Sequence, residues 1–169
     1  PQAWGHGALI PIRVVLREFV ARGLAAESQA GTSQRDSLWH FIQAELPETL
    51  RDFAQPLQDE LLNTGGILLL DGLDEVPEAD ARRVQVKEVV EHFAAVFPKV
   101  RILATSRTYA YQNQDWKLSG FAEAILAPFE QAQIHRFVER WYAFVGQARQ
   151  LPDSEVQGRA VLLNNAIES

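Results

Sequence analysis

The chain has 169 residues, of which 47% are hydrophobic and 22% are charged, and it carries a formal net charge of −6. This composition is typical of a globular domain, and the acidic balance argues against non-specific binding to nucleic acid or to an anionic membrane. The absence of cysteine excludes disulfides and thiolate metal sites. No apolar run is long enough to cross a bilayer. Because the chain also contains no Met, we expect it to be a piece of a longer polypeptide.

The first predicted element is a strand over residues 8–16. Pro11 favours an edge position for this strand, because proline has no backbone donor for a neighbour on both sides. Residues 17–24 are predicted to be a short helix or a variable connection, and residues 27–35 a polar loop.

Two helices are predicted to follow this loop. The carboxylate of Asp36 is expected to cap the first helix, and Pro47 is expected to open the second. Gly65 is expected to end the second helix, because glycine adopts the left-handed conformation of a helix C-cap at little cost. The apolar positions of both helices recur at helical spacing, which is typical of packing against a core.

The next element is an apolar strand over residues 67–70, which leads into Asp71, Asp74 and Glu75. An apolar run without alternation predicts a strand buried on both faces, as in a parallel α/β sheet, and such sheets bind ligands at the carboxyl ends of their strands. Three carboxylates there suit a hydrated Mg²⁺ and an attacking water, the requirements of nucleoside triphosphate hydrolysis. The structural alternative is an Asp that caps the next helix, but a cap needs one acceptor and not three.

A helix is predicted after Pro77 and is ended by Pro98. The strand over residues 100–104 follows, and the intervening helix predicts that it pairs in parallel with the strand over 67–70. Thr105, Ser106 and Arg107 would then lie at the same edge of the sheet as the acidic residues. Arg107 could donate two hydrogen bonds to a γ-phosphate there, or it could simply pair with a nearby carboxylate.

The rest of the chain is predicted to begin with an irregular, aromatic-rich connection over residues 108–121. A fourth short strand is predicted over residues 123–126. A strongly amphipathic helix follows Pro128, the pattern breaks over 146–152, and a last helix covers 154–167.

In combination, these segments resemble the NACHT domain of STAND-class P-loop NTPases, in its bacterial form. The resemblance covers roughly residues 8–145, and its most specific part is Asp71-Gly72-Leu73-Asp74-Glu75, similar to a Walker B segment, with a sensor 1 strand ending in Thr105-Ser106-Arg107. It implies an α/β fold: a partial P-loop NTPase three-layer sandwich with a mostly parallel sheet, missing its first (P-loop) strand and followed by helices. Residues 1–128 would be the NACHT core fragment, and residues 129–169 the start of the following helical region.

The resemblance also implies roles for the site residues. Asp71 would hold Mg²⁺, Asp74 or Glu75 would orient or activate the attacking water, and Arg107 with Ser106 would sense the γ-phosphate of ATP or GTP. The family switches between an autoinhibited and an oligomeric signalling state with its nucleotide, which implies a cytoplasmic protein with protein partners and no direct contact with nucleic acid or membrane.

The sequence departs from the family at one point, because it contains no Gly-x-x-x-x-Gly-Lys-[Ser/Thr] phosphate-binding loop. We therefore expect the parent to be a nucleoside triphosphatase and this fragment alone to be inactive, with little or no nucleotide bound. In the family, the missing strand lies between the strands over 100–104 and 123–126. Its absence predicts an exposed sheet edge that pairs with another copy or domain, a rearranged sheet, or an edge covered by other segments.

Two alternatives remain open at this point. One is a non-hydrolysing protein-interaction or oligomerisation module of the same fold. The other is an unrelated doubly wound α/β protein, in which the acidic residues are caps and surface charges and Asp71 lies far from Arg107.

Overall fold

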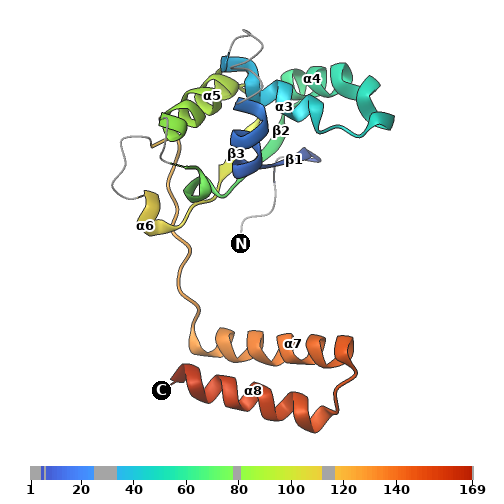
Figure 1. Cartoon of the computed structure of the whole chain (residues 1–169), viewed down its shortest axis with the longest axis vertical. Coiled ribbons are helices and arrows are strands. Elements are labelled where there is room, and N and C mark those ends of the chain that lie inside the picture. Colours follow the sequence, from blue (N-terminus) through green and yellow to red (C-terminus); the bar gives the residue numbers. More distant parts are fainter. Residues whose placement is uncertain (1–4, 6, 25–33, 78–80, 112–116, 169) are drawn as a thin grey trace. The chain divides into compact units, whose positions relative to one another are not determined.

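The computed structural model describes the chain except for residues 1–4, 6, 25–33, 78–80, 112–116 and 169 (Figure 1). Residues 27–33 of the predicted polar loop and residues 112–116 of the connection over 108–121 therefore lie outside the described residues, while residues 34 and 35 belong to a short helical turn and not to a loop. The chain divides into two compact units, Pro1–Ala122 and Glu123–Ser169. The boundary between residues 128 and 129 that the family resemblance implies stays a prediction.

The first unit is built on a parallel sheet, as the sequence predicts. In the described residues its strands are β1 (Ile10–Val15), β2 (Gly66–Asp71) and β3 (Arg101–Ala104), in the order β1-β2-β3. Both pairings are parallel, with Val14 opposite Leu70 and Leu70 opposite Ala104. β1 lies at an edge, where the missing donor of Pro11 is tolerated.

Short helical segments surround the longer helices of this unit. The described segments are α1 (Leu16–Glu18), η1 (Phe19–Leu24), η2 (Gln34–Asp36), α3 (Ser37–Ala44), η3 (Glu48–Phe53), α4 (Ala54–Asn63), η4 (Leu73–Glu75), α5 (Arg82–Val96) and α6 (Thr108–Tyr111). The α6 turn was not predicted, since four residues are too few to show a helical period.

The predicted cap of the first helix is wrong. Asp36 stands at the N-cap of α3 but makes no side-chain capping hydrogen bond. Its carboxylate lies 3.1 Å from Nε2 of His92 on α5 instead. A contact between residues far apart in sequence has replaced the local one, and it ties α5 to the start of α3.

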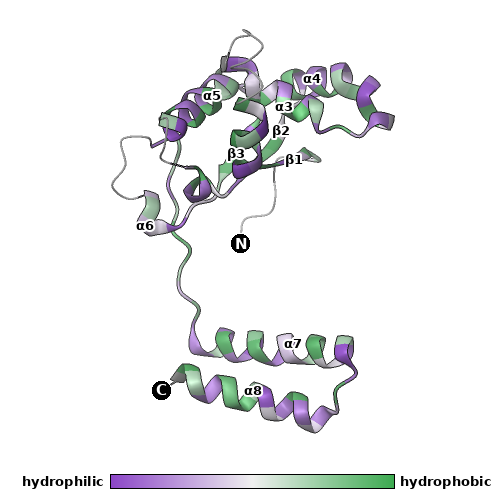
Figure 2. Ribbon diagram, in the orientation of Figure 1, coloured by the Kyte–Doolittle hydropathy of each residue, from purple (hydrophilic) through white to green (hydrophobic). Residues whose placement is uncertain are grey.

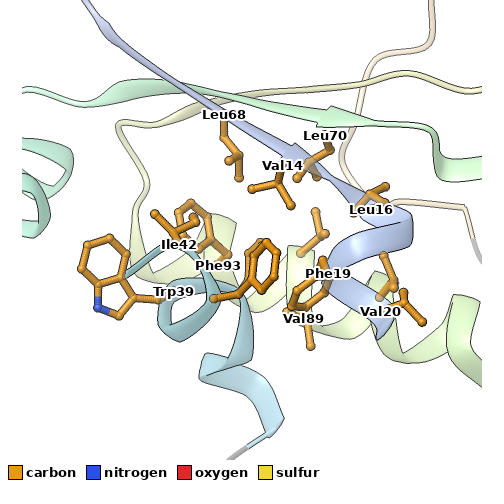
Figure 3. Close-up of a cluster of buried hydrophobic side chains, with 14 of the residues drawn as sticks. Val14, Leu16, Phe19, Val20, Trp39, Ile42, Leu68, Leu70, Val89 and Phe93 are labelled. Atoms are coloured by element: carbon orange, nitrogen blue, oxygen red, sulfur yellow. The ribbon is translucent and has the colours of Figure 1, made fainter. Parts of the chain in front are cut away.

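The core lies on one side of the sheet (Figure 3). The side chains of Val14, Leu68 and Leu70 point from the strands toward Phe19, Ile42 and Phe93, and all six are at most 7% exposed. The residues of β2 that alternate with these, Ile67, Leu69 and Asp71, are only half-buried. The prediction of a strand buried on both faces is therefore wrong, because the helices that supply the core cluster cover one face only.

The predicted fourth strand over residues 123–126 is also wrong, because the structure describes these residues without a strand. Ile125 and Leu126 are 73% and 95% exposed. An extended apolar segment becomes a strand only when a neighbour satisfies its backbone groups, and no described strand pairs with this one. β3 consequently forms the second edge of the described sheet, with Leu103 exposed.

The second unit contains two helices, α7 (Gln131–Arg149) and α8 (Asp153–Glu168). α7 begins with a capping box between Glu130 and Gln133, which satisfies two backbone donors at its start. The helix passes through the predicted break at Gly146 and ends at Gln150, where the backbone is left-handed. Among the described helices of the chain, none has the length and apolar composition needed to span a membrane.

Candidate functional site

The candidate site lies where β2 and β3 end and is organised by Thr105. The N–H of Thr105 donates to the carbonyl of Leu70 at 2.9 Å, and its own carbonyl accepts from the N–H of Leu73 at 2.8 Å. Its hydroxyl accepts from the N–H of Gly72 and donates to Oδ1 of Asp71, both at 3.1 Å. Backbone hydrogen bonding between the two strand ends thus continues beyond β3, and the Thr105 hydroxyl holds the Asp71 carboxylate in place.

The chain turns at Gly72, directly after Asp71. Gly72 has a left-handed backbone with φ 81° and ψ 56°, a conformation that costs other L-residues about 1–2 kcal/mol. The turn leads into η4, which carries Asp74 and Glu75. The small residue between the acidic positions therefore lets the chain bring a second and third carboxylate back over the strand end.

Asp71 is also bound by an arginine that the sequence interpretation did not assign to the site. Nη2 of Arg13, on β1, lies 2.6 Å from Oδ2 of Asp71. The hydrogen bond from Arg13, and then that from Thr105, lowers the pKa of the Asp71 carboxyl below its ordinary value. Asp71 is therefore an ionised, partly exposed carboxylate with a donor on each oxygen.

Asp74 is the most enclosed of the three carboxylates, with a side chain that is only 13% exposed. Its Oδ1 accepts from the backbone N–H of Arg107 at 3.2 Å, and its Oδ2 lies 3.4 Å from Nε of the same arginine. Nη1 of Arg107 donates to the hydroxyl of Tyr109 at 3.3 Å. Tyr109 first, and then Asp74, raises the pKa of Arg107.

Glu75 is held more loosely than Asp74. Its Oε2 lies 3.4 Å from Nη1 of Arg17 on α1, and both side chains are about half exposed. Each acidic residue of the cluster thus has one arginine partner, and the arginines come from β1, α1 and the segment after β3. We call these six residues the carboxylate–arginine cluster: Arg13, Arg17, Asp71, Asp74, Glu75 and Arg107.

The structure brings most of the predicted site residues together, with one exception. The hydroxyl of Ser106 donates to the carbonyl of Arg107 at 3.3 Å and bonds to no carboxylate among the described residues. Thr105, its neighbour, makes that contact instead. The alternation of side chains along an extended strand end places adjacent residues on opposite sides, so this choice could have been predicted from the register.

Arg13 could also have been found from the sheet order. Once β1 pairs with β2, Val15 lies opposite Asp71, and Arg13 is two residues earlier on the same face of the sheet. The sequence predicts the strand but not its neighbour. Arg17 lies on α1 after β1, and the sequence carries no comparable signal for it.

The donors around Asp71 fit a magnesium ion that is bound partly through water and phosphate. Mg²⁺ in phosphate-binding sites is held by one or two protein oxygens, while waters and phosphate oxygens supply the rest. The exposed carboxylate of Asp71 and the hydroxyl of Thr105 are suitable oxygens. In the described part of the chain, no group of three or more acidic or histidine side chains forms a complete metal cage.

Comparison with known proteins gives a family for this arrangement of residues. The model of the NACHT domain matches residues 12–143, which include β2, β3, most of β1 and all residues of the carboxylate–arginine cluster. Comparison with curated proteins and with solved structures found no match.

Proposed function

Since the chain belongs to the NACHT domain family, a family of nucleotide-binding NTPase modules, we propose that it supplies the metal and water half of a nucleotide-dependent signalling switch. The observation that carries the proposal is the joining of two strand ends: Asp71 bonds to Thr105, and Asp74 bonds to Arg107. Acidic and basic groups at adjacent parallel strand ends form the arrangement that triphosphate hydrolysis needs.

In this proposal, Asp71 holds Mg²⁺, in part through water, with the Thr105 hydroxyl beside it. The bound ion would neutralise charge on the phosphates of ATP or GTP. Arg13 occupies one oxygen of Asp71, so it must release that oxygen or turn toward a phosphate when the ion binds. A guanidinium suits this exchange, because carboxylate and phosphate oxygens offer it the same geometry.

The contacts support different roles for the other two carboxylates. Asp74 is enclosed and bound to Arg107 through both oxygens, so we assign it as the positioning residue for that arginine. Glu75 is half exposed and has only a longer contact with Arg17, which leaves it able to accept a proton from water. Glu75 is accordingly the general base in this proposal.

Arg107 is the γ-phosphate sensor of the proposal, and Ser106, whose hydroxyl donates to the Arg107 carbonyl in this structure, would have to turn to become a second contact. The side chain of Arg107 is 70% exposed, and its guanidinium is held by Asp74 at 3.4 Å and Tyr109 at 3.3 Å. A γ-phosphate carries more charge than the Asp74 carboxylate and could draw the guanidinium away. The loss of that phosphate on hydrolysis would return Arg107 to Asp74, which gives two states for a signal.

The phosphate-binding loop must come from polypeptide outside these 169 residues, since the sequence lacks that motif. The exposed outer edge of β3 is where an additional strand could pair, and Leu103 on this strand is 55% exposed. We therefore propose that residues 1–128 are an incomplete NTPase core, that residues 129–169 begin the next helical region, and that this chain alone is inactive.

Calorimetry and hydrolysis assays test this proposal on two polypeptides. The 169-residue chain should show no binding of Mg²⁺ with ATP or GTP, whereas a longer parent polypeptide with a phosphate loop should bind and hydrolyse one of them. In that parent, Glu75→Gln should lower hydrolysis about 10²–10⁴-fold while nucleotide stays bound. Asp71→Asn should weaken binding only when Mg²⁺ is present.

Asp52→Asn is the matched control, because Asp52 is an exposed carboxylate on η3 outside the cluster. It should leave binding and hydrolysis unchanged. Micromolar binding of nucleotide by the 169-residue chain would contradict the divided site. Unchanged hydrolysis in Glu75→Gln would remove Glu75 from the role of general base.

The second candidate is a non-hydrolysing interaction module of the same fold. One observation favours it: each carboxylate of the cluster already has an arginine partner within the chain, so the ion pairs could be purely structural. This candidate predicts that the parent polypeptide binds its protein partners equally well with Asp71→Asn or without it, and that no nucleotide is turned over.

A further inference from the structure

One face of α7 is apolar, basic and uncovered by the rest of its own unit. We call it the aromatic–arginine face. It lines a shallow groove of about 560 Å³. Its members on α7 are Arg136, Phe137, Arg140, Trp141 and Phe144, and Phe129, just before the helix, lines the same groove.

The aromatic side chains of this face are exposed to solvent over more than half of their surface. Phe137, Trp141 and Phe144 are 56%, 52% and 67% exposed, although their 4- and 3-residue spacing places them along one stripe of the helix. By the helical rise of 1.5 Å per residue, the stripe is about 10 Å long. Figure 2 shows that hydrophobic positions recur along α7.

The other face of α7 is the one that packs on α8. Val138 and Gly146 of α7 and Ala160 of α8 are buried, and Gly146 approaches Val156 so closely that a side chain there would overlap it. The hairpin therefore already uses one face of α7 for its own stability. The three large aromatic residues line the groove instead, where the rings of Phe137 and Trp141 stack with their centroids 6.2 Å apart.

Two arginines lie among these aromatic residues. Arg136 and Arg140 are one helical turn apart and line the same groove. Within the described residues, neither guanidinium forms an ion pair, whereas the arginines of the carboxylate–arginine cluster are all paired. On a chain of net charge −6, these two positive charges lie next to each other on one apolar groove.

We propose that the aromatic–arginine face binds an acidic amphipathic helix of a protein partner. The apolar side of that helix would cover the aromatic stripe, and its Asp or Glu side chains would pair with Arg136 and Arg140. Aromatic residues and arginine are the types that contribute most at protein interfaces, and a stripe with this spacing suits a helix in a groove.

A membrane surface fits these observations less well. Helices that lie on anionic bilayers carry their basic residues on the polar side, away from the apolar residues that insert. Here the arginines share the groove with the aromatic residues. The acidic net charge of the chain would also repel an anionic surface.

The test uses the full 169-residue chain and two fluorescent 18-residue peptides. One peptide is an amphipathic helix with Leu on one side and Glu on the other, and the second has Lys in place of every Glu. Fluorescence anisotropy should show saturable binding of the Glu peptide, weakened by raising NaCl from 50 to 500 mM. The Lys peptide should bind at least about 10-fold more weakly.

Variants on the same helix separate the face from general charge effects. Arg136→Glu with Arg140→Glu should weaken binding of the Glu peptide at least about 10-fold, and Trp141→Ala should weaken it to a similar extent. Arg149→Glu is the matched control: it reverses a charge at the end of α7, outside the groove, and should leave affinity within about 2-fold. Circular dichroism should show the same helix content in all variants.

Three results would overturn the proposal. The first is equal binding of the Glu and Lys peptides, and the second is an equal loss of binding in Arg149→Glu. The third is occupation of the face by something else. This would be detected as binding to vesicles of anionic phospholipid that is lost in Trp141→Ala, or as self-association in analytical ultracentrifugation that is lost in the same variant.

Discussion

Gly65→Ala should destabilise the first unit by a calculable amount, because Gly65 combines a positive φ with a close backbone approach. Its φ is 97°, and a Cβ built on it would overlap the carbonyl oxygen of Lys99 and lie 3.0 Å from the carbonyl carbon. Nζ of Lys99 also donates to the carbonyl of Asn63 at 2.5 Å, so the end of α4 and the turn before β3 are in direct contact. The strain therefore falls where β2 begins.

The expected cost has two parts. A left-handed conformation costs a residue with a Cβ about 1–2 kcal/mol. Overlap with a backbone atom that cannot rotate away adds about 1–3 kcal/mol, the range for overpacked sites. The free energy of unfolding should therefore fall by about 2–5 kcal/mol in Gly65→Ala. At a urea m-value of about 2 kcal/mol/M, the midpoint should fall by about 1–2.5 M.

Gly120→Ala is the matched control, because Gly120 has φ 76° but open space around its Cβ position. It should lose only the conformational part, about 1–2 kcal/mol. Urea unfolding followed by circular dichroism and tryptophan fluorescence gives both values. Equal losses in the two variants would refute the argument, because they would mean that the approach of Lys99 to Gly65 adds no cost.

Three further predictions concern the sheet and the site. Arg13→Ala should raise the pKa of Asp71 toward its ordinary value, as measured by carboxyl NMR. A carboxyl whose pKa is lowered on folding stabilises the protein above its unfolded pKa of about 3.9, so the stability lost in this variant should be largest at neutral pH and should shrink as pH falls through the folded pKa. A loss of stability that does not depend on pH would contradict the ion pair. Thr105→Val should lower the free energy of unfolding by about 1 kcal/mol for each hydroxyl hydrogen bond lost, and Thr105→Ser should lower it less. Urea midpoints that rank the two variants in the opposite order would contradict the hydroxyl bridge between Asp71 and Gly72. Leu68→Ala should cost about 2–5 kcal/mol and Leu69→Ala clearly less, because adjacent residues of β2 face opposite sides of the sheet, and equal costs would show that both faces are closely packed.

The strands of the sheet could be predicted because each is an apolar run bounded by polar or glycine residues. β2 extends the predicted 67–70 strand by one residue at each end, and β3 agrees with the predicted strand from residue 101. The helix between them predicts parallel pairing, which the structure has. The left-handed backbone at Gly65 follows from the same local chemistry.

Features that depend on neighbours could not be predicted in this way. The segment over 123–126 has the composition of a strand but no described partner, and composition does not report a partner. Asp36 has the residue type of a cap but lies next to His92, 56 positions away. The role of Arg13 depends on which strand lies beside β2. Each of these outcomes is decided by a contact between distant residues, which local propensity does not encode.

The two hydrogen bonds of the Thr105 backbone have a mechanical consequence for the candidate site. Because they join the ends of β2 and β3, the two strand ends move as one body, and Arg107 follows only two residues later. Within the described residues, Arg107 bonds to Asp74 in the segment after β2 and otherwise to its own sequence neighbours Ser106, Tyr109 and Ala110. In the proposed switch, a ligand that draws the Arg107 guanidinium away would break its ion pair with Asp74, while the hydrogen bond from the Arg107 backbone to Asp74 could stay in place. The contact with the enclosed carboxylate of Asp74 would therefore determine how strongly a ligand has to attract Arg107 before its side chain moves.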